Sequence, residues 1–498
     1  MHYVSTRDSS RRLTASQAIV EGLSRDGGLY LPESIPQLTL ADIRALARLS
    51  YPERAAKIMK LYLEEFSEEE LLGFAQKAYG PAKFDTPAAA PVVQLADNTY
   101  IQELWHGPTC AFKDMALQML PHLLTASLTK TEEFRTVCIL VATSGDTGKA
   151  ALEGFKDVDK TKILVFYPVD GVSPMQKLQM TTQEGGNVAV CAIHGNFDDA
   201  QSAVKSIFTN DEIKAELAKK NMMFSSANSI NWGRLVPQIV YYFSAYADLC
   251  KMGQLQVGEP MNVVVPTGNF GNILAGYYAK HMGLPIQTMV CASNTNNVLT
   301  DFLKTGTYDR NRDFYATTSP SMDILISSNL ERLLYHMSGE SDAAVRGWMT
   351  QLAENGKYTV EPEVMAKIQN EFAAGYCDEA AVADTIHKTY TDQNYLCDTH
   401  TAVAVKVYRD YVAQTGDDLP TVIDSTASPY KFSKSVLTAV LEGNTPQLDE
   451  FDMVEELHRV TGAAVPAPLA ALKDKAVRFT QVCDRENMSQ MVFQLLNL

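Results

Sequence analysis

The chain has 498 residues, 46% of them hydrophobic and 20% charged, which is ordinary for a soluble globular protein. Its formal net charge of −16 argues against a general surface for nucleic acids or anionic membranes. The eight cysteines are scattered without a C-x-x-C pair, which argues against a disulfide framework or a zinc site. No apolar run approaches membrane-spanning length, and the N-terminus has no apolar signal-peptide core. We therefore expect a cytoplasmic enzyme-sized protein without nucleic-acid or membrane partners.

Residues 1–95 are predicted to form a mainly helical N-terminal domain. Helical periodicity covers 38–49, 51–63 and 67–78, and Ser67 followed by three glutamates is a favourable helix start. The proline- and alanine-rich stretch 81–91 predicts a linker into the next unit.

From residue 96 the pattern changes to strands that alternate with helices. Uninterrupted apolar runs of strand length predict buried strands at 137–142, 162–167, 188–193, 261–265 and 286–292. Such runs indicate parallel sheets that are covered by helices on both faces, hence an α/β fold. Residues 441–498 are expected to form helices that pack on the large domain. Ligands in this class bind at the loops that follow the carboxyl ends of the strands.

The stretch WHGPTCAFKDM, residues 105–115, contains a candidate nucleophile. A strand at 99–104 runs into a turn at 106–109, and 111–117 is typical of the first turn of an amphipathic helix. Lys113 is then close to a helix N-terminus among apolar residues. Desolvation and the positive end of the helix dipole would both lower its pKa, and a neutral amine forms Schiff bases. For an arbitrary lysine, a solvated surface position is the commoner interpretation.

Three loops complete a candidate site. The loop 267–272 (TGNFGN) precedes a helix, so its N–H groups could surround a phosphate. The loop 143–148 (TSGDTG) offers hydroxyl and N–H groups that suit a carboxylate, and 425–429 is a hydroxyl-rich loop that leads to Lys431. Each loop alone is equally compatible with a simple turn. Together with an activatable lysine they match the requirements of pyridoxal phosphate.

These segments resemble those of threonine synthases, in the longer branch that has an N-terminal domain. The resemblance rests on YVSTRDSS with GLSRDGGLYLPESIP, HGPTCAFKDMALQML, ATSGDTGKAALEGF, PTGNFGNILAGYYAK and DSTASPYKF. It covers nearly the whole chain, and the HGPTxAFKD and TGNFGN pair is highly specific. Cys110 and the sequence Ser428-Pro429-Tyr430 depart from the residues expected most often in this family.

The resemblance implies fold type II of the pyridoxal-phosphate enzymes, which is like the tryptophan synthase β subunit. Two parallel-sheet domains with helices on both faces would form a catalytic core over 96–440. A smaller subdomain at about 137–235 would be inserted in the larger one, with 441–498 as a C-terminal helical extension. The implied reaction converts O-phospho-L-homoserine and water to L-threonine and phosphate, in a monomer or homodimer.

The resemblance also implies the site residues. Lys113 would be the catalytic residue and would bind the cofactor as a Schiff base, Thr426 would contact the pyridine nitrogen, and no metal is implied. The cofactor phosphate would be held by Gly268, Asn269, Phe270, Gly271 and Asn272. The substrate would be held by Thr143, Ser144, Gly145, Asp146 and Thr147.

Two alternatives remain open at this point. One is an O-phosphohomoserine phospho-lyase that yields 2-oxobutyrate, and the other is a non-catalytic pyridoxal-phosphate-binding protein. Serine or threonine dehydratase and cysteine synthase are weaker options. Candidate partners for the substrate phosphate are Lys149, Lys177, Arg234 and Lys431. His106 and His400, which lie close to the motifs, are expected to be structural.

Overall fold

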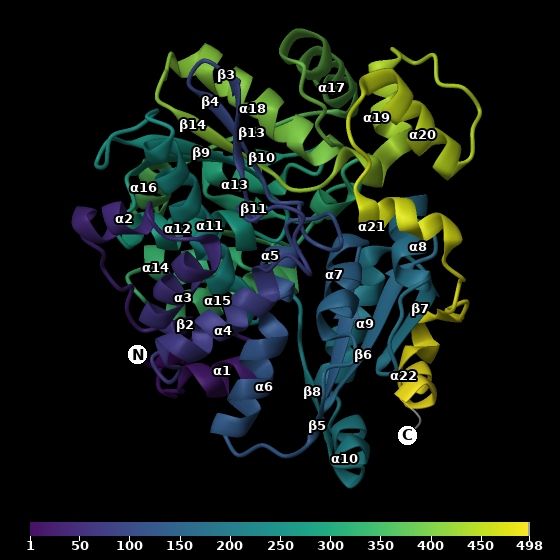
Figure 1. Ribbon diagram of the computed structural model, residues 1–498. Coiled ribbons are helices and arrows are strands. Elements are labelled where there is room, and N and C mark those ends of the chain that lie inside the picture. Colours follow the sequence, from purple (N-terminus) through teal and green to yellow (C-terminus); the bar gives the residue numbers. More distant parts are fainter. Residues whose placement is uncertain (497–498) are drawn as a thin grey trace.

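The computed structural model describes residues 1–496, so the last two residues of the predicted C-terminal extension, 497–498, lie outside the described residues. The N-terminal part contains one antiparallel strand pair and four helices (Figure 1). These are β1 (Tyr3–Ser5), β2 (Tyr30–Pro32), α1 (Ala15–Glu21), α2 (Leu40–Leu46), α3 (Tyr51–Tyr62) and α4 (Glu68–Tyr79). Side chains of Thr14, Thr39 and Ser67 cap three of the helices, as hydroxyl residues at these positions favour. The predicted helical character of this region is confirmed.

The larger sheet has six strands in the order β13-β10-β9-β14-β4-β3. Their bounds are β3 (Val92–Ala96), β4 (Thr99–Glu103), β9 (Met261–Pro266), β10 (Ile286–Ser293), β13 (Phe372–Tyr376) and β14 (Thr421–Ser425). All neighbouring pairs are parallel except β3 with β4. The sheet therefore carries its ligand-binding loops at one edge, where β4, β9 and β14 end side by side.

Both faces of this sheet are covered by helices. Val263 and Val265 of β9 belong to the hydrophobic cluster formed with α11 (Trp232–Lys251) and α12 (Gly271–His281). Val264 belongs to the opposite cluster, formed with α18 (Thr399–Thr415). The alternation explains why the three consecutive residues 263–265 are all valine, as the sequence pattern of a strand buried on both faces predicts.

The smaller sheet has five parallel strands in the order β15-β7-β6-β5-β8, and it lies on the right in Figure 1. Its strands are β5 (Thr136–Ala142), β6 (Thr161–Pro168), β7 (Val188–His194), β8 (Met222–Ser225) and β15 (Val482–Asp484). The connecting helices are α7 (Asp146–Phe155), α8 (Pro174–Thr181), α9 (Phe197–Thr209) and α10 (Asp211–Lys219). The two predicted α/β units with parallel sheets are thus present.

The C-terminal part differs from the sequence prediction in one respect. Helices α19 (Ser433–Val440) and α20 (Glu450–Thr461) pack against one another, and α19 packs on α17 (Glu379–Gln393) at the large sheet. Beyond them, β15 joins the edge of the smaller sheet and α22 (Met488–Leu496) packs there. A three-residue strand has no periodicity of its own, because its pairing is decided by the tertiary partner.

The connection between β10 and β13 contains α13 (Val298–Thr305), β11 (Thr307–Asp309), α14 (Leu330–Met337), α15 (Asp342–Asn355), β12 (Lys357–Thr359) and α16 (Pro362–Glu371). Within it, residues 310–329 have no long helix. Asp323 orders this segment, since its carboxylate accepts hydrogen bonds from Asn294, Asn296 and Thr317. Among residues 1–496, no helix is long and apolar enough to cross a membrane.

Candidate active site

The lysine segment and the late hydroxyl loop are joined by backbone hydrogen bonds. Ala111 and Ala427 form an isolated antiparallel bridge, and the N–H of Phe112 donates to the carbonyl of Thr426 at 2.8 Å. This bridge sets Lys113 beside Thr426 although the two lie far apart in the sequence. Lys113 and Thr426 line one cavity, and the hydroxyl of Thr426 has no hydrogen-bond partner among the described residues.

Lys113 is buried in that cavity, with 9% of its surface exposed. It is the residue before α5 (Asp114–Leu117), so the predicted position at a helix N-terminus is correct. Its Nζ atom lies 3.4 Å from Oγ of Ser321 and 3.9 Å from Oδ2 of Asp146. Burial lowers the pKa of Lys113 to about 8, although Asp146 acts in the opposite direction. Because α5 has only four residues, desolvation and not the helix dipole is the main cause.

The loop 143–148 folds tightly between β5 and α7. The hydroxyl of Thr143 accepts hydrogen bonds from the N–H of Gly145 at 2.9 Å and of Gly148 at 2.8 Å. Gly145 has φ +125°, and a Cβ atom there would come within 2.4 Å of Gln176, so glycine is required on both counts. Of the predicted substrate residues, those that line the cavity are Thr143, Ser144 and Thr147.

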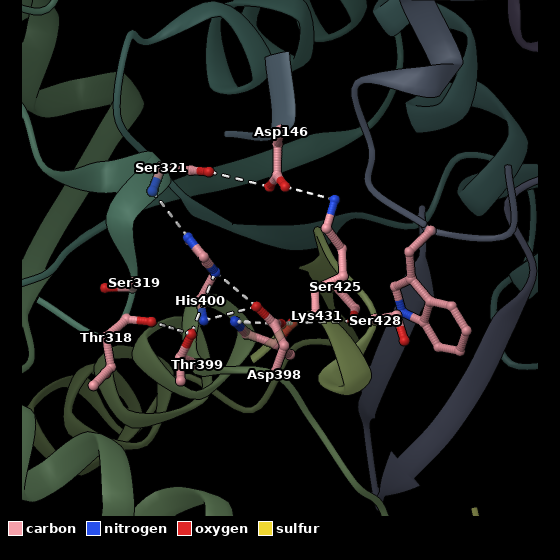
Figure 2. Close-up of polar contacts among 12 residues, drawn as sticks. Asp146, Thr318, Ser319, Ser321, Asp398, Thr399, His400, Ser425, Ser428 and Lys431 are labelled. Atoms are coloured by element: carbon pink, nitrogen blue, oxygen red, sulfur yellow. Dashed lines mark hydrogen bonds and ion pairs between the residues drawn. The ribbon is translucent and has the colours of Figure 1, made fainter. Parts of the chain in front are cut away.

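Asp146, from the same loop, is directed toward protein partners. Its Oδ1 lies 2.6 Å from Nζ of Lys431 and accepts from Gln176 at 2.9 Å, while Oδ2 accepts from Ser321 at 3.1 Å (Figure 2). Burial raises the pKa of Asp146, but the ammonium groups of Lys431 and Lys113 outweigh burial and hold it well below its usual range. Both oxygens of its side chain are therefore engaged by protein groups.

The loop 267–272 follows β9 and ends at α12. Phe270 precedes the helix in the left-handed conformation with φ +64°, and Gly271 and Asn272, the first residues of α12, line the cavity. A Cβ atom at Gly268 would come within 2.7 Å of the carbonyl of Ser321, so only glycine fits there. These groups fit a phosphate, since free N–H groups at a helix N-terminus bind anions.

Asn272 contributes to this loop differently from the expectation. Its side-chain amide donates to Asp424 at 3.0 Å and accepts from the hydroxyls of Tyr241 and Tyr242. Its side chain is fully occupied, and what Asn272 could offer an anion is its backbone N–H.

Arg234 is a buried basic candidate that has no acidic partner among the described residues. It lies on α11 in the cavity wall, next to Asn228 and Ser229, and is 4% exposed. One guanidinium nitrogen donates to the carbonyl of Ala227 at 3.0 Å, whereas the buried Nε has no partner in the described chain. Burial lowers the pKa of Arg234 to about 10, so it remains a cation. An unpaired buried cation fits an anionic ligand.

The remaining candidates lie outside the cavity or are paired. Lys149 is 3.3 Å from Glu153, and Lys177 is exposed on α8. His106 is held between Asp85 at 2.7 Å and Glu103 at 2.8 Å. These contacts support the structural role expected for His106.

Ser321 and Asp398 are site residues that the sequence did not single out. His400 Nδ1 lies 2.7 Å from Oδ2 of Asp398, and its Nε2 accepts the N–H of Ser321 at 3.2 Å (Figure 2). Because Nε2 is an acceptor here, Nδ1 carries the proton. His400 thus fixes the serine whose hydroxyl bridges Lys113 and Asp146. Ser321 lies in an irregular segment without any local signal.

The described cavity combines a buried amine, a glycine loop at a helix N-terminus and a hydroxyl without a partner, on two α/β units. Family models match three consecutive stretches: "Threonine synthase N terminus" over residues 2–79, "Pyridoxal-phosphate dependent enzyme" over 84–382, and "Threonine synthase, C-terminal" over 401–492. The fold and the site define a pyridoxal-phosphate-dependent enzyme of fold type II, as predicted.

Comparisons with individual proteins give the same result as the family models. The chain is 38% identical to threonine synthase of Pseudomonas aeruginosa, covering 95% of this chain and 97% of that one. The structure of pyridoxal-phosphate-bound threonine synthase from Brucella melitensis matches with a TM-score of 0.86 and 40% identity, over 100% of this chain and 98% of that one. The chain belongs to the threonine synthase family. It is also 40% identical to human threonine synthase-like 1 over 88% of its own length, and spans 60% of that relative's length.

Proposed function

We propose that the protein is a threonine synthase, which converts O-phospho-L-homoserine and water to L-threonine and phosphate. The observation that carries the proposal is that one cavity joins the buried Lys113 amine, a helix N-terminus and the unpaired cation Arg234. A substrate with an amine, a carboxylate and a phosphate needs complementary groups of these kinds.

Lys113 is proposed to bind the cofactor through Nζ, which its lowered pKa favours. With cofactor and substrate in place, Nζ would be positioned to take the proton from the substrate α-carbon. Ser321 at 3.4 Å and Asp146 at 3.9 Å are placed to stabilise the ammonium that forms. The bound cofactor supplies the conjugated ring that stabilises negative charge at the substrate carbons.

The proposed cofactor residues are those of the sequence prediction. Backbone N–H groups of Gly268, Asn269, Phe270, Gly271 and Asn272 would hold the phosphate. The unpaired hydroxyl of Thr426 would face the pyridine nitrogen. A hydroxyl cannot hold a pyridinium proton as a carboxylate would, so the nitrogen would stay mostly neutral.

The substrate would be held at both ends. The hydroxyls of Ser144 and Thr147, with N–H groups at the start of α7 that include those of Gly145 and Asp146, suit its carboxylate. Arg234 suits its phosphate, because a buried guanidinium recognises that group by charge and by hydrogen bonds.

We also propose that the enzyme acts in the cytoplasm on this small molecule alone, without a nucleic-acid partner, as a monomer or homodimer. The acidic net charge supports the absence of a nucleic-acid partner, and the eight free cysteines support a reducing compartment.

The test is a product assay on purified protein loaded with pyridoxal phosphate. Threonine, phosphate and 2-oxobutyrate would be quantified together after addition of O-phosphohomoserine. Threonine equal to phosphate is the expected result. Phosphate matched by 2-oxobutyrate would identify a phospho-lyase, and absence of all three products would identify a non-catalytic binding protein.

A further inference from the structure

Asp424 is a buried carboxyl group for which the proposed mechanism has no use. It lies on β14 just before the loop of Thr426, and its Oδ2 accepts hydrogen bonds from Asn272 at 3.0 Å and from Tyr242 at 3.1 Å. Its Oδ1 is buried and receives no hydrogen bond from the described residues. Within that part of the chain no lysine, arginine or histidine forms an ion pair with it, so an ionised Asp424 would be an uncompensated buried charge.

Gln102 carries a second buried acceptor of the same kind. It is the register partner of Asp424 on the neighbouring parallel strand β4, and Nε2 of Gln102 donates to the carbonyl of Tyr241 at 2.8 Å. Both side chains therefore face α11, which also supplies Tyr242 to Asp424. The Oε1 atom of Gln102 is buried without a partner in residues 1–496. Two acceptors cannot satisfy one another, but a proton on one of them turns the pair into a hydrogen bond.

We propose that Asp424 is a neutral carboxylic acid that donates through Oδ1 to Gln102 and, through Asn272, positions the phosphate loop. This inference rests on the proposed assignment of residues 267–272 to the cofactor phosphate. Burial raises the pKa of Asp424 to about 7, although Asn272 and Tyr242 act in the opposite direction. The titratable groups that face it are the hydroxyls of Tyr241 and Tyr242, while β4 and α12 present neutral amides.

The neutral state has a consequence for anion binding. Asn272 is the second residue of α12, and its side chain ties the start of that helix to Asp424. A negative carboxylate at this place would weaken the attraction between the positive end of the helix and the phosphate bound there. A protonated acid gives the same anchorage without the negative charge. Asp424 is therefore a positioning residue and not a catalytic one.

The experiment compares the full-length wild type with Asp424→Asn. The amide of Asn can donate to Gln102 and accept from Asn272 and Tyr242, so it reproduces the proposed state. We expect the variant to bind pyridoxal phosphate within about twofold of the wild type near pH 6, by absorbance titration of the apoprotein. Difference infrared spectra of the loaded proteins should show the C=O band of a protonated carboxylic acid in the wild type alone.

A matched control is Asp398→Asn. The carboxylate of Asp398 accepts the N–H groups of His400 at 2.9 Å and Thr401 at 3.0 Å, so an amide loses acceptors there and should lower Tm at every pH. For Asp424 the folded pKa is raised, so the contribution of this group to stability is greatest at low pH and is lost as pH rises from about 4 through about 7. Relative to Asp424→Asn, the wild type should lose about 2 °C or more in Tm over that range.

The proposal is overturned if the infrared band is absent, or if Asp424→Asn loses about tenfold or more in cofactor affinity. A second variant separates the two assignments. Gly268→Ala should weaken cofactor binding by crowding Ser321. If it leaves the affinity unchanged, the phosphate-loop half of the proposal is wrong, while the infrared band still decides the protonation of Asp424 without any turnover.

Discussion

The Nζ atom of Lys431 lies 2.6 Å from Oδ1 of Asp146, and both side chains are buried. This ion pair ties the loop after β14 to the first residue of α7, across the two sheets. It removes Lys431 from the candidates for the substrate phosphate. It also keeps Asp146 ionised beside the reactive amine of Lys113.

Lys431→Met should therefore destabilise the protein by about 3–5 kcal/mol, because it leaves a buried carboxylate without its main partner. The folded pKa of Asp146 is lowered, so the stability from this pair is present above the unfolded pKa and is lost as pH falls through the folded value. The variant should show a smaller loss of stability toward acid pH, measured by urea unfolding. The exposed pair of Lys388 with Asp384 is the control, since Lys388→Met should cost at most about 1 kcal/mol. Equal stability of both variants would contradict this interpretation.

Lys113→Ala should abolish formation of every product and the visible absorbance of the bound cofactor. In the apoprotein, the pKa of about 8 predicts that half of the Lys113 amines are neutral near that pH, against about 10.4 for an ordinary lysine. Competitive acetylation at a series of pH values, read by mass spectrometry of the Lys113 peptide, measures this directly. Labelling that rises only near pH 10 would refute an activated amine.

Arg234→Gln should raise KM for O-phosphohomoserine by about 10-fold to 100-fold, because charged hydrogen bonds to the phosphate are lost. Cofactor affinity should change little. Lys177→Gln, which removes an exposed charge on α8, should leave KM unchanged. A loss of cofactor affinity with unchanged KM would assign Arg234 to the cofactor phosphate instead.

His400→Leu should lower kcat by about tenfold, because the N–H of Ser321 loses its acceptor and the serine hydroxyl is no longer fixed beside Lys113. His400→Gln keeps an acceptor oxygen and should restore most of kcat. Steady-state kinetics of the two loaded variants measures the difference. If the leucine and glutamine variants were equally impaired, the role of the ring Nε2 as an acceptor would be excluded.

The sequence was sufficient for the parts of the fold and site that have local signals. Continuous apolar strands, hydroxyl caps and the position of Lys113 before a helix all follow from short-range patterns, and the structure confirms them. The kind of role expected for Gly268 was also predictable, since a glycine loop before a helix suits a phosphate.

Other features depend on contacts between distant segments. Lys431 looks like an available cation until Asp146 is placed beside it, and the amide of Asn272 is occupied by residues of α11 and β14. Ser321 acquires its role from His400, which lies on another element. Such pairings are set by tertiary packing, so no local sequence pattern predicts them.

The strand Val482–Asp484 has a consequence for the synthesis of the chain. It pairs with β7 (Val188–His194), so one edge of the smaller sheet remains open until residues 482–484 have emerged from the ribosome, long after β7 itself. During that interval the backbone groups of β7 are available to other strands, including those of neighbouring nascent chains. The smaller sheet, which carries the TSGDTG loop, is thus completed only after the larger sheet, whose last strand β14 ends at Ser425.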